Sequence, residues 1–210
     1  MQRESNKRKQ QAMETKNRIY DATMSLIEEM GFENVQIADI RNRAKVSNGL
    51  FYYYFRNKAD VLTEAFIANG KKYNQQIYDK YLTDLHGLEK ITVFINRLSE
   101  FRMHVYRKDN LRFHYINMLT NIDRSAVVLR DGSAMNDILS EALEEAVSMG
   151  VIKPVASIKE MVKHISIVIR GVTIDYLLCL DSESFDLGKT ALDIVNAYLV
   201  GFLMNTEKDA

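Results

Sequence analysis

The sequence predicts an all-α protein of about nine helices. Only one of its 210 residues is proline and nine are glycine, so few positions interrupt a helix. Apolar residues recur at helical spacing in long segments, beginning with Ile19, Ala22, Leu26 and Ile27. Hydrophobic residues make up 47% of the chain, which is enough for a buried core. We therefore expect one helical domain or two small ones.

The chain begins with a basic segment. Residues 1–18 hold six Lys or Arg against two Glu, although the whole chain has 28 residues of each sign. A basic end on an acidic body favours local contact with a polyanion. Residues 1–13 have almost no apolar side chain and are expected to form a flexible basic arm, either a solvated tail or a source of extra DNA contacts. A first helix is predicted from about Thr15 to Met30, ended by Gly31.

Two short helices separated by a break follow in residues 34–62. Ile37, Ile40 and Ala44 form an apolar stripe at helical spacing. Ser47 can cap the next helix, about residues 48–54. In that helix we expect Leu50, Phe51 and Tyr54 to point inward and Asn48, Gly49, Tyr52 and Tyr53 to be more open. This is a helix-turn-helix arrangement, in which the second helix enters the DNA major groove.

The residues of this stretch form a restrictive pattern, which comprises Ala38-Asp39-Ile40, Ala44, Val46-Ser47, Gly49, the aromatic run 51–55 and the run 57–62. They resemble the DNA-binding domain of the tetracycline-repressor (TetR-like) family. Two departures are visible, since Gln36 stands where the family usually has Thr and Lys45 where it usually has Gly. The second asks a non-glycine residue to take the turn, at a backbone cost if its φ is positive. The resemblance is strong over about residues 15–65 and only architectural beyond.

The resemblance implies an N-terminal helix-turn-helix domain over residues 14–60 and an effector-binding and dimerisation domain, a helical bundle, over 61–210. Asn48 and Gln36 can bond base edges or phosphates, and Leu50 can contact a thymine methyl group. Tyrosine and lysine side chains would mostly hold phosphates, and the family implies this role for Tyr53 and Lys58. The residues expected to contact DNA are Gln36, Arg41, Ser47, Asn48, Gly49, Leu50, Tyr52, Tyr53 and Lys58.

Longer helices are predicted beyond the motif. One begins near Lys58, is capped by Asn57 and runs to about residue 81. Others are expected at about 88–108, at about 111–122 and at about 185–205. Between them, one helix should end at Gly150 and another should begin after the capping box at Ser157. Residues 165–174, ISIVIRGVTI, favour a strand by propensity. The capping box and an apolar pattern of about 24 residues favour a helix there.

The last two helices carry more apolar residues than one small bundle can bury. The resemblance implies that they form a four-helix interface in a homodimer, whose two recognition helices would lie about 34–36 Å apart and bind a palindrome. A monomer with a fully internal core is the alternative. The expected interface residues are Ile174, Leu177, Leu178, Leu192, Val195, Leu199 and Phe202.

The middle helices are rich in methionine and aromatic residues. Plain core packing is the simpler interpretation of each one, whereas the resemblance implies an apolar pocket for a small effector with a few orienting polar groups. The candidate pocket residues are Phe101, Met103, His104, Phe113, Met118, Ile122, Met135, Leu139, His164, Val168, Arg170 and Asp175.

Signatures of other classes of protein do not occur in the sequence. The four histidines and the single cysteine lack the spacing of a zinc site, and no glycine-rich phosphate loop or G-x-S-x-G nucleophile appears. We therefore expect no cofactor, no metal and no enzyme activity. The charged N-terminus and the lack of a long apolar run predict a cytoplasmic protein without a membrane segment.

The sequence thus predicts a DNA-binding transcriptional regulator, and the resemblance implies a repressor that a small apolar or amphipathic effector releases from a palindromic operator. Two alternatives stay open. One is an architectural or assembly protein that binds DNA without an effector, and the other is a helical-bundle enzyme with an incidental helix-turn-helix, for which no catalytic constellation is found.

Overall fold

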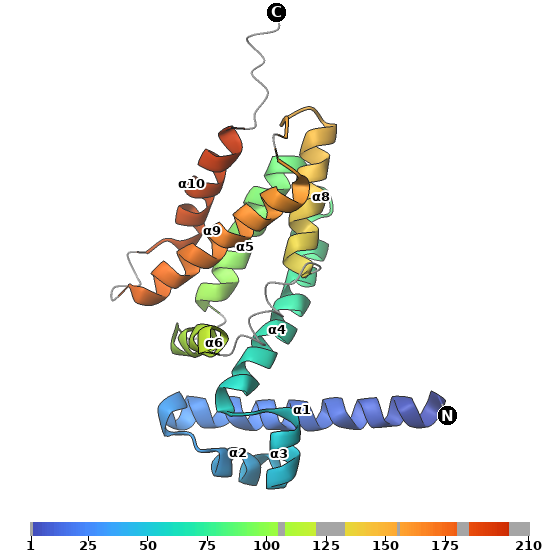
Figure 1. Cartoon of the computed structure of the whole chain (residues 1–210), viewed down its shortest axis with the longest axis vertical. Coiled ribbons are helices and arrows are strands. Elements are labelled where there is room, and N and C mark those ends of the chain that lie inside the picture. The colour runs from blue at the N-terminus through green and yellow to red at the C-terminus, as the bar shows by residue number, and fades with distance from the viewer. Residues whose placement is uncertain (1, 105–107, 121–132, 155, 180–184, 202–210) are drawn as a thin grey trace, which may run out of the picture. The chain divides into compact units, whose positions relative to one another are not determined.

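The computed structural model describes residues 2–104, 108–120, 133–154, 156–179 and 185–201, and in these ranges it has nine α-helices and no β-strand (Figure 1). The predicted all-α class is confirmed. No helix in these ranges is long and apolar enough to cross a membrane. The chain divides into two compact units, described separately below.

The first unit contains the chain up to Ala68 and also most of a later helix, from Asp109 onward. Its elements are α1 (Gln2–Met30), a 3₁₀ turn (Phe32–Asn34), α2 (Ile37–Ala44), α3 (Asn48–Tyr54), the first half of α4 (Lys58–Ile77) and α6 (Lys108–Thr120). The core that holds α2 and α3 against α1 comprises Ile19, Ala22, Leu26, Ile27, Phe32, Val35, Ile40, Ala44, Val46, Phe51, Phe55, Val61 and Leu62. This core fixes the orientation of α3, the predicted recognition helix.

Three helix ends predicted in this unit, at Gly31, Ser47 and Asn57, are confirmed by their hydrogen bonds. Gly31 ends α1 with a φ of 80°, and its N–H donates to the Ile27 carbonyl at 2.9 Å. The Ser47 hydroxyl accepts the Leu50 N–H at 3.2 Å and caps α3. The Asn57 side chain accepts the Asp60 N–H at 2.9 Å and caps α4. Local polar residues therefore determine where these helices start and stop.

The second unit is a helical bundle. Its elements are the second half of α4, a π-helix that continues it (Tyr78–Leu82), α5 (Gly87–His104), α8 (Ala134–Ser148), α9 (Ile158–Leu178) and α10 (Leu187–Val200). Helix α5 packs against α8 and α10, and α9 packs against the same two helices. Gly87 has a φ of 56°, and a Cβ there would lie 3.4 Å from the Ala146 backbone. Glycine therefore allows α5 to begin close to α8.

The β-branched segment at residues 165–174 is helical, as predicted, within α9. The Glu160 carboxylate accepts the Ser157 N–H at 3.0 Å, and the Ser157 hydroxyl accepts the Glu160 N–H at 3.3 Å. Ile165 and Ile169 are buried on the inner face of the helix. Tertiary burial and the capping box thus outweigh the local strand preference.

Two predicted boundaries differ from the structure. Helix α1 begins at Gln2 and not near Thr15, so the helix includes the predicted arm over residues 2–13. That segment lacks Gly and Pro and is rich in Gln, Lys and Arg, which extend an existing helix readily. The boundary at residue 60 also differs, because the first unit reaches Ala68 and takes in most of α6.

Candidate nucleic-acid interface

Helix α3 presents one face to solvent and packs the other into the first unit. Phe51 is fully buried and Tyr54 half-buried, as predicted, whereas Tyr53 is 79% exposed. Leu50 was predicted to point inward, but it is 36% exposed because it shares the outer face of this short helix. The exposed residues of α3 are Asn48, Gly49, Leu50, Tyr52 and Tyr53. An amide, an apolar side chain and two phenols thus lie on one open surface.

Three residues that precede α3 were also predicted to contact DNA or to adopt an unusual backbone conformation. Gln36 is exposed at the start of α2, and its N–H donates to the Asp39 carboxylate at 3.0 Å. Arg41 is half-buried, and its Nε makes no hydrogen bond in the described part of the chain. Lys45 adopts a left-handed conformation with φ 54° and ψ 49°, so the backbone cost expected there is present.

The structure corrects the role predicted for Lys58. Its Nζ donates to the carbonyl oxygens of Phe32 at 2.7 Å, Glu33 at 3.1 Å and Val35 at 2.9 Å. A lysine ammonium has three N–H donors, and these three bonds use all of them. In this structure the ammonium therefore ties the start of α4 to the 3₁₀ turn and has no N–H left for the predicted phosphate contact. The partners lie 23–26 residues away along the chain, so no local pattern indicated them.

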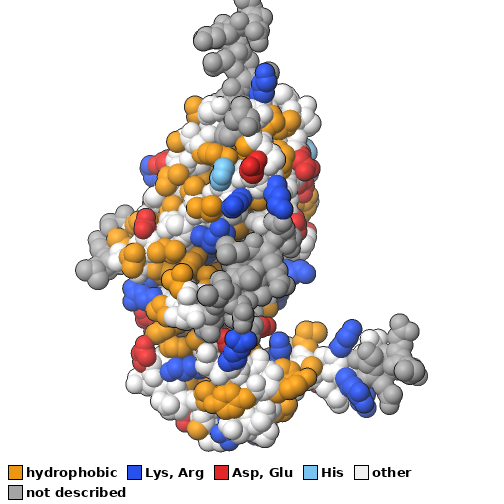
Figure 2. Space-filling view, in the orientation of Figure 1, with side chains coloured by type: hydrophobic (Ala, Val, Ile, Leu, Met, Phe, Trp, Pro, Cys, Tyr) orange, Lys and Arg blue, Asp and Glu red, His pale blue; other side chains and the backbone are white. Residues whose placement is uncertain are grey.

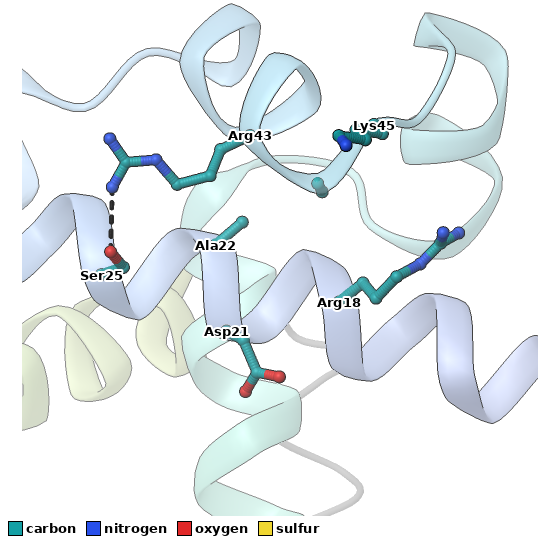
Figure 3. Close-up of a pocket in the computed structure, with 7 residues that line it drawn as sticks. Arg18, Asp21, Ala22, Ser25, Arg43 and Lys45 are labelled. Carbon is teal, nitrogen blue, oxygen red and sulfur yellow. Dashed lines mark hydrogen bonds between the residues drawn. The ribbon is translucent and has the colours of Figure 1, made fainter.

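A basic groove lies between α1 and α2 (Figure 3), with a volume of about 340 Å³ and a lining of Arg18, Asp21, Ala22, Ser25, Arg43, Ala44 and Lys45. At one end, the Arg43 guanidinium donates to the Ser25 hydroxyl at 2.9 Å and to both carboxylate oxygens of Glu29. The hydrogen bond with Arg43 lowers the pKa of Glu29 below its usual value. At the other end, Arg18 and Lys45 are exposed, and Asp21 points away from α2. The groove is therefore positively charged at its open end.

The amino-terminal part of α1 is also basic. Lys7, Arg8 and Lys9 are exposed on consecutive positions of this helix. Figure 2 shows Lys and Arg side chains on the coloured part of this segment. The helical geometry keeps these cations apart on the helix surface, so no single compact patch forms.

Helix α6 is anchored in the first unit by three side chains. Phe113 stacks on Phe32 with ring centroids 3.9 Å apart. His114 stacks on Phe66 at the same separation. Asn117 donates to the Thr63 hydroxyl at 2.8 Å and to the buried Asp60 carboxylate at 3.2 Å. The helix is thus fixed to the base of α4.

The predicted pocket residues are divided between the two units. Phe113 and Met118 lie on α6 in the first unit, where Phe113 stacks on Phe32 and Met118 is buried. Ile122 lies outside the described residues. The other nine belong to the second unit: Phe101 and Leu139 are buried, Met103, Met135, Val168 and Arg170 are half-buried, and His104, His164 and Asp175 are exposed. His164 is paired with Tyr198, with Nδ1 and the phenol oxygen 2.9 Å apart.

Part of the predicted dimer interface is wrong. Leu177, Val195 and Leu199 are buried within the single chain, so their side chains are not available to a second chain. Leu192 is half-buried, Phe202 lies outside the described residues, and Ile174 and Leu178 are exposed. The predicted residues mixed both faces of each helix, because apolar side chains occur all around α9 and α10.

Helices α9 and α10 expose further small and apolar residues beside Ile174 and Leu178, and the predicted interface did not include these further residues. We call the whole exposed surface the α9–α10 stripe, and it consists of Ile167, Gly171, Ile174 and Leu178 on α9 and Ile194, Ala197 and Val200 on α10. Its α9 members repeat at intervals of three and four residues, so their common face could have been read from the sequence. A Cβ added at Gly171 would meet no atom within 4 Å, so close packing inside the protomer does not require this glycine.

The family comparison matches the first unit. Residues 19–65 match the family model "Bacterial regulatory proteins, tetR family". Among curated proteins, the chain is similar to the HTH-type transcriptional regulator BetI of Escherichia coli (strain K12 / DH10B), with 36% identity over 73 residues. The match covers 35% of each protein, so the chain spans about a third of the length of the curated relatives it matches.

Solved structures share the fold over most of the chain. Thermus thermophilus FadR, a TetR family transcriptional repressor in complex with lauroyl-CoA, is 19% identical with a TM-score of 0.75, covering 93% of this chain and 98% of that one. SmeT, the repressor of the Stenotrophomonas maltophilia multidrug efflux pump SmeDEF, is 19% identical with a TM-score of 0.59, covering 92% and 94%. A SmeT–triclosan complex gives 18% identity and a TM-score of 0.58, covering 91% and 93%. At this identity the likeness extends to the fold alone.

Proposed function

We propose that this chain, a member of the tetR family of bacterial regulatory proteins, is a transcriptional repressor that binds a palindromic operator as a homodimer and is released by a small effector. The exposed face of α3 carries this proposal. Its cap, its buried Phe51 and its outward Asn48, Tyr52 and Tyr53 are what a helix that enters a DNA groove requires.

The α3 face divides into reading and positioning groups. Asn48, at the amino-terminal end of the helix, can bond an adenine edge, and Leu50 can contact a thymine methyl group. The phenols of Tyr52 and Tyr53 can donate to phosphates, which position the protein without reading sequence. Arg18 and Lys45, at the open end of the basic groove, extend the positive surface for phosphates. Lys58 is left out, because its donors are used inside the first unit.

The α9–α10 stripe supports a dimer. It exposes Leu178 at 73% and Val200 at 62%, which a lone helix face in water does not favour. The small residues Gly171 and Ala197 allow a partner helix to approach closely. A twofold axis through this stripe would pair it with the same stripe of a second chain, and two heads would then meet two half-sites.

Two helices offer a route from an effector to DNA. Helix α4 runs without a break from the first unit into the second, and α6 begins at Lys108 of the second unit before its anchored part. The Lys108 ammonium also donates to the Cys179 carbonyl at the end of α9. An effector that prefers another arrangement of the second unit would shift the population away from the DNA-bound spacing. A coupling of about 1–3 kcal/mol changes DNA affinity roughly 5- to 150-fold.

The structural neighbours support a small apolar or amphipathic effector. FadR was solved with lauroyl-CoA and SmeT with triclosan, and both ligands have a large apolar part. Phe101 and Leu139 supply buried apolar surface in the second unit of this chain. The alternative of a DNA-binding protein without an effector predicts that no small molecule changes DNA affinity.

The test begins with duplexes selected by the protein from a random pool. Fluorescence anisotropy then compares wild type, Asn48→Ala, Tyr53→Phe and the control Gln76→Ala, which changes an exposed residue of α4 in the second unit. Asn48→Ala should weaken binding of the selected duplex by about 1–3 kcal/mol, with little effect on unrelated DNA. Tyr53→Phe should weaken binding of the selected duplex and of unrelated DNA, and Gln76→Ala should change neither affinity. If no sequence is enriched, or if both α3 variants bind like wild type, the proposal fails.

A further inference from the structure

Arg102 of α5 is a buried cation in the second unit that the function proposed above does not use. Its side chain points into the bundle and is only 8% exposed. Nη1 donates to the Thr173 hydroxyl oxygen at 2.7 Å and lies 3.4 Å from the Ile169 carbonyl oxygen. Nε is buried and has no hydrogen-bond partner in the described structure. The guanidinium therefore retains a donor that no described protein group satisfies.

The same unit pairs another buried cation with two carboxylates. Lys90, also on α5, is 1% exposed, and its Nζ lies 2.7 Å from a Glu141 oxygen and 2.8 Å from a Glu145 oxygen. Arg102 contacts only a hydroxyl and a carbonyl, and no Asp or Glu of the described residues forms an ion pair with it. A guanidinium stays protonated in proteins, so burial cannot neutralise it. An unpaired buried charge is costly, which makes a purely structural role for Arg102 a poor explanation.

Thr173 orients this guanidinium. Its hydroxyl donates to the Ile169 carbonyl one turn earlier at 2.6 Å, so a lone pair on Oγ1 is left for Arg102. The arrangement fixes one edge of the planar fork against α9 and leaves Nε to another partner. A planar fork with fixed donors suits the oxygen atoms of a carboxylate or phosphate.

A second buried polar atom supports a ligand-binding region. Asn74 is buried, and its Oδ1 has no hydrogen-bond partner in the described structure. Asn74 follows Tyr73, whose ring stacks on Phe101 with centroids 3.5 Å apart, and Phe101 precedes Arg102. The two residues with unsatisfied polar atoms are thus each next in sequence to one member of this aromatic pair between α4 and α5.

We propose that Arg102 binds an anionic oxygen group, a carboxylate or a phosphate, on an otherwise apolar effector. The inference rests on the function proposed above, because it names the chemistry of the effector of the same protein. The anion accepts hydrogen bonds from the guanidinium, and Thr173 acts as a positioning residue. The sequence analysis did not single out Arg102, although it shares a helical face with Ile91, Ile95 and Leu98.

The test uses three probes with the same alkyl chain: dodecanoate, dodecyl phosphate and 1-dodecanol, each below the concentration at which it forms micelles. Isothermal titration calorimetry measures their binding to full-length wild type, Arg102→Met and the control Arg97→Met. Arg97 lies on the same helix but at the surface, paired with Glu100. Wild type and Arg97→Met should bind at least one anion roughly tenfold or more tightly than the alcohol. In Arg102→Met this preference should disappear, and comparison of the two anions tells a carboxylate from a phosphate ligand.

Two further measurements distinguish anion binding by Arg102 from a structural role and from a loss of DNA binding. Without ligand, Arg102→Met should unfold at the same or a higher urea concentration than wild type, whereas a structural arginine would lower that midpoint. Anisotropy with the selected duplex reports DNA binding independently, so failure of the repressor proposal is seen separately. The inference is overturned if wild type binds the alcohol as tightly as both anions, if Arg102→Met keeps the preference, or if no probe binds up to its solubility.

Discussion

The polar contacts that flank α3 in the first unit differ from those that join α5 to α8 in the second unit. Around α3 the side chains bind backbone groups, whereas between α5 and α8 they bind one another. The side chains of Ser47 and Asn57 each cap a helix by accepting the backbone N–H of the residue three positions later. By contrast, Lys90 reaches Glu141 and Glu145 over 51 and 55 residues. The orientation of α3 is therefore fixed by hydrogen bonds to backbone groups, two of them local caps. The contact between α5 and α8 is fixed by ion pairs between side chains far apart in sequence, which depend on how these helices pack together.

The difference fits the two proposed tasks. A DNA-reading surface has to keep one geometry, and the caps around α3 and the Lys58 ammonium fix it. A unit that responds to an effector needs two packing arrangements of similar free energy. The π-helix at Tyr78–Leu82, whose Tyr78 hydroxyl donates to Glu141 at 2.7 Å, lies in the same ionic cluster. π-Helical turns are rare and occur frequently at functional sites.

The prediction with the largest expected effect concerns the dimer, in which the second units of two chains would hold their two first units together. The double variant Ile174→Asp, Leu178→Asp places charges on the α9–α10 stripe and should convert a dimer to a monomer. Loss of bivalent contact should weaken binding to a palindromic duplex by roughly 10²- to 10⁴-fold. Sedimentation velocity gives the mass and anisotropy gives the affinity. Val151→Asp, at an exposed apolar site outside the stripe, should leave both unchanged.

The next effect concerns the ionic cluster. Glu145→Ala leaves the buried Lys90 with one partly exposed carboxylate and also removes the acceptor of the Gly87 N–H, 2.9 Å away. We expect a loss of about 2–3 kcal/mol in the free energy of unfolding, measured with urea. The control Glu144→Ala, exposed on the same helix, should change it by less than about 0.5 kcal/mol. Equal effects of the two variants would show that the cluster does not hold the second unit.

The same carboxylate predicts a pH dependence. Burial alone would raise the pKa of Glu145, but hydrogen bonds from Lys90, the Gly87 N–H and His86 outweigh it and lower the pKa below the ordinary value of 4.5. The folded state therefore binds the Glu145 proton less readily than the unfolded state does. This contribution to stability is present above pH 4.5 and is lost as the pH falls through the lowered pKa. Urea midpoints between pH 7 and pH 3 should fall less steeply in Glu145→Gln than in wild type, and parallel curves would contradict this.

The smallest expected effect lies in the first unit. Lys45→Gly relieves a left-handed backbone conformation, so we expect a gain of about 0.5–1 kcal/mol in stability. Asn42→Gly, three residues earlier inside α2, should instead cost about 0.5 kcal/mol. Hydrogen exchange of the α2 and α3 amides measures both. A loss of protection in Lys45→Gly would mean that the lysine side chain, and not its backbone, matters there.

Local chemistry explains how much the sequence could predict. The caps at Ser47, Asn57 and Ser157 and the stop at Gly31 follow from residues within a few positions, so the helices they bound were predicted well. The start of α1 was missed because propensity alone extends a helix that has no stop signal. The Lys58 contacts and the pairing of Lys90 depend on residues 23–55 positions away, which periodicity cannot indicate. Apolar residues around all sides of α9 and α10 likewise concealed which of them stay exposed.

The most direct test of the account is the mass of the complex with a selected duplex. Sedimentation equilibrium should give two chains per duplex when two inverted half-sites lie about one helical turn apart. Inserting about five base pairs between them turns one half-site by half a helical turn and should abolish this complex. One chain per duplex, or an affinity that the insertion leaves unchanged, would contradict the claim that the second unit holds two DNA-reading units at a fixed spacing.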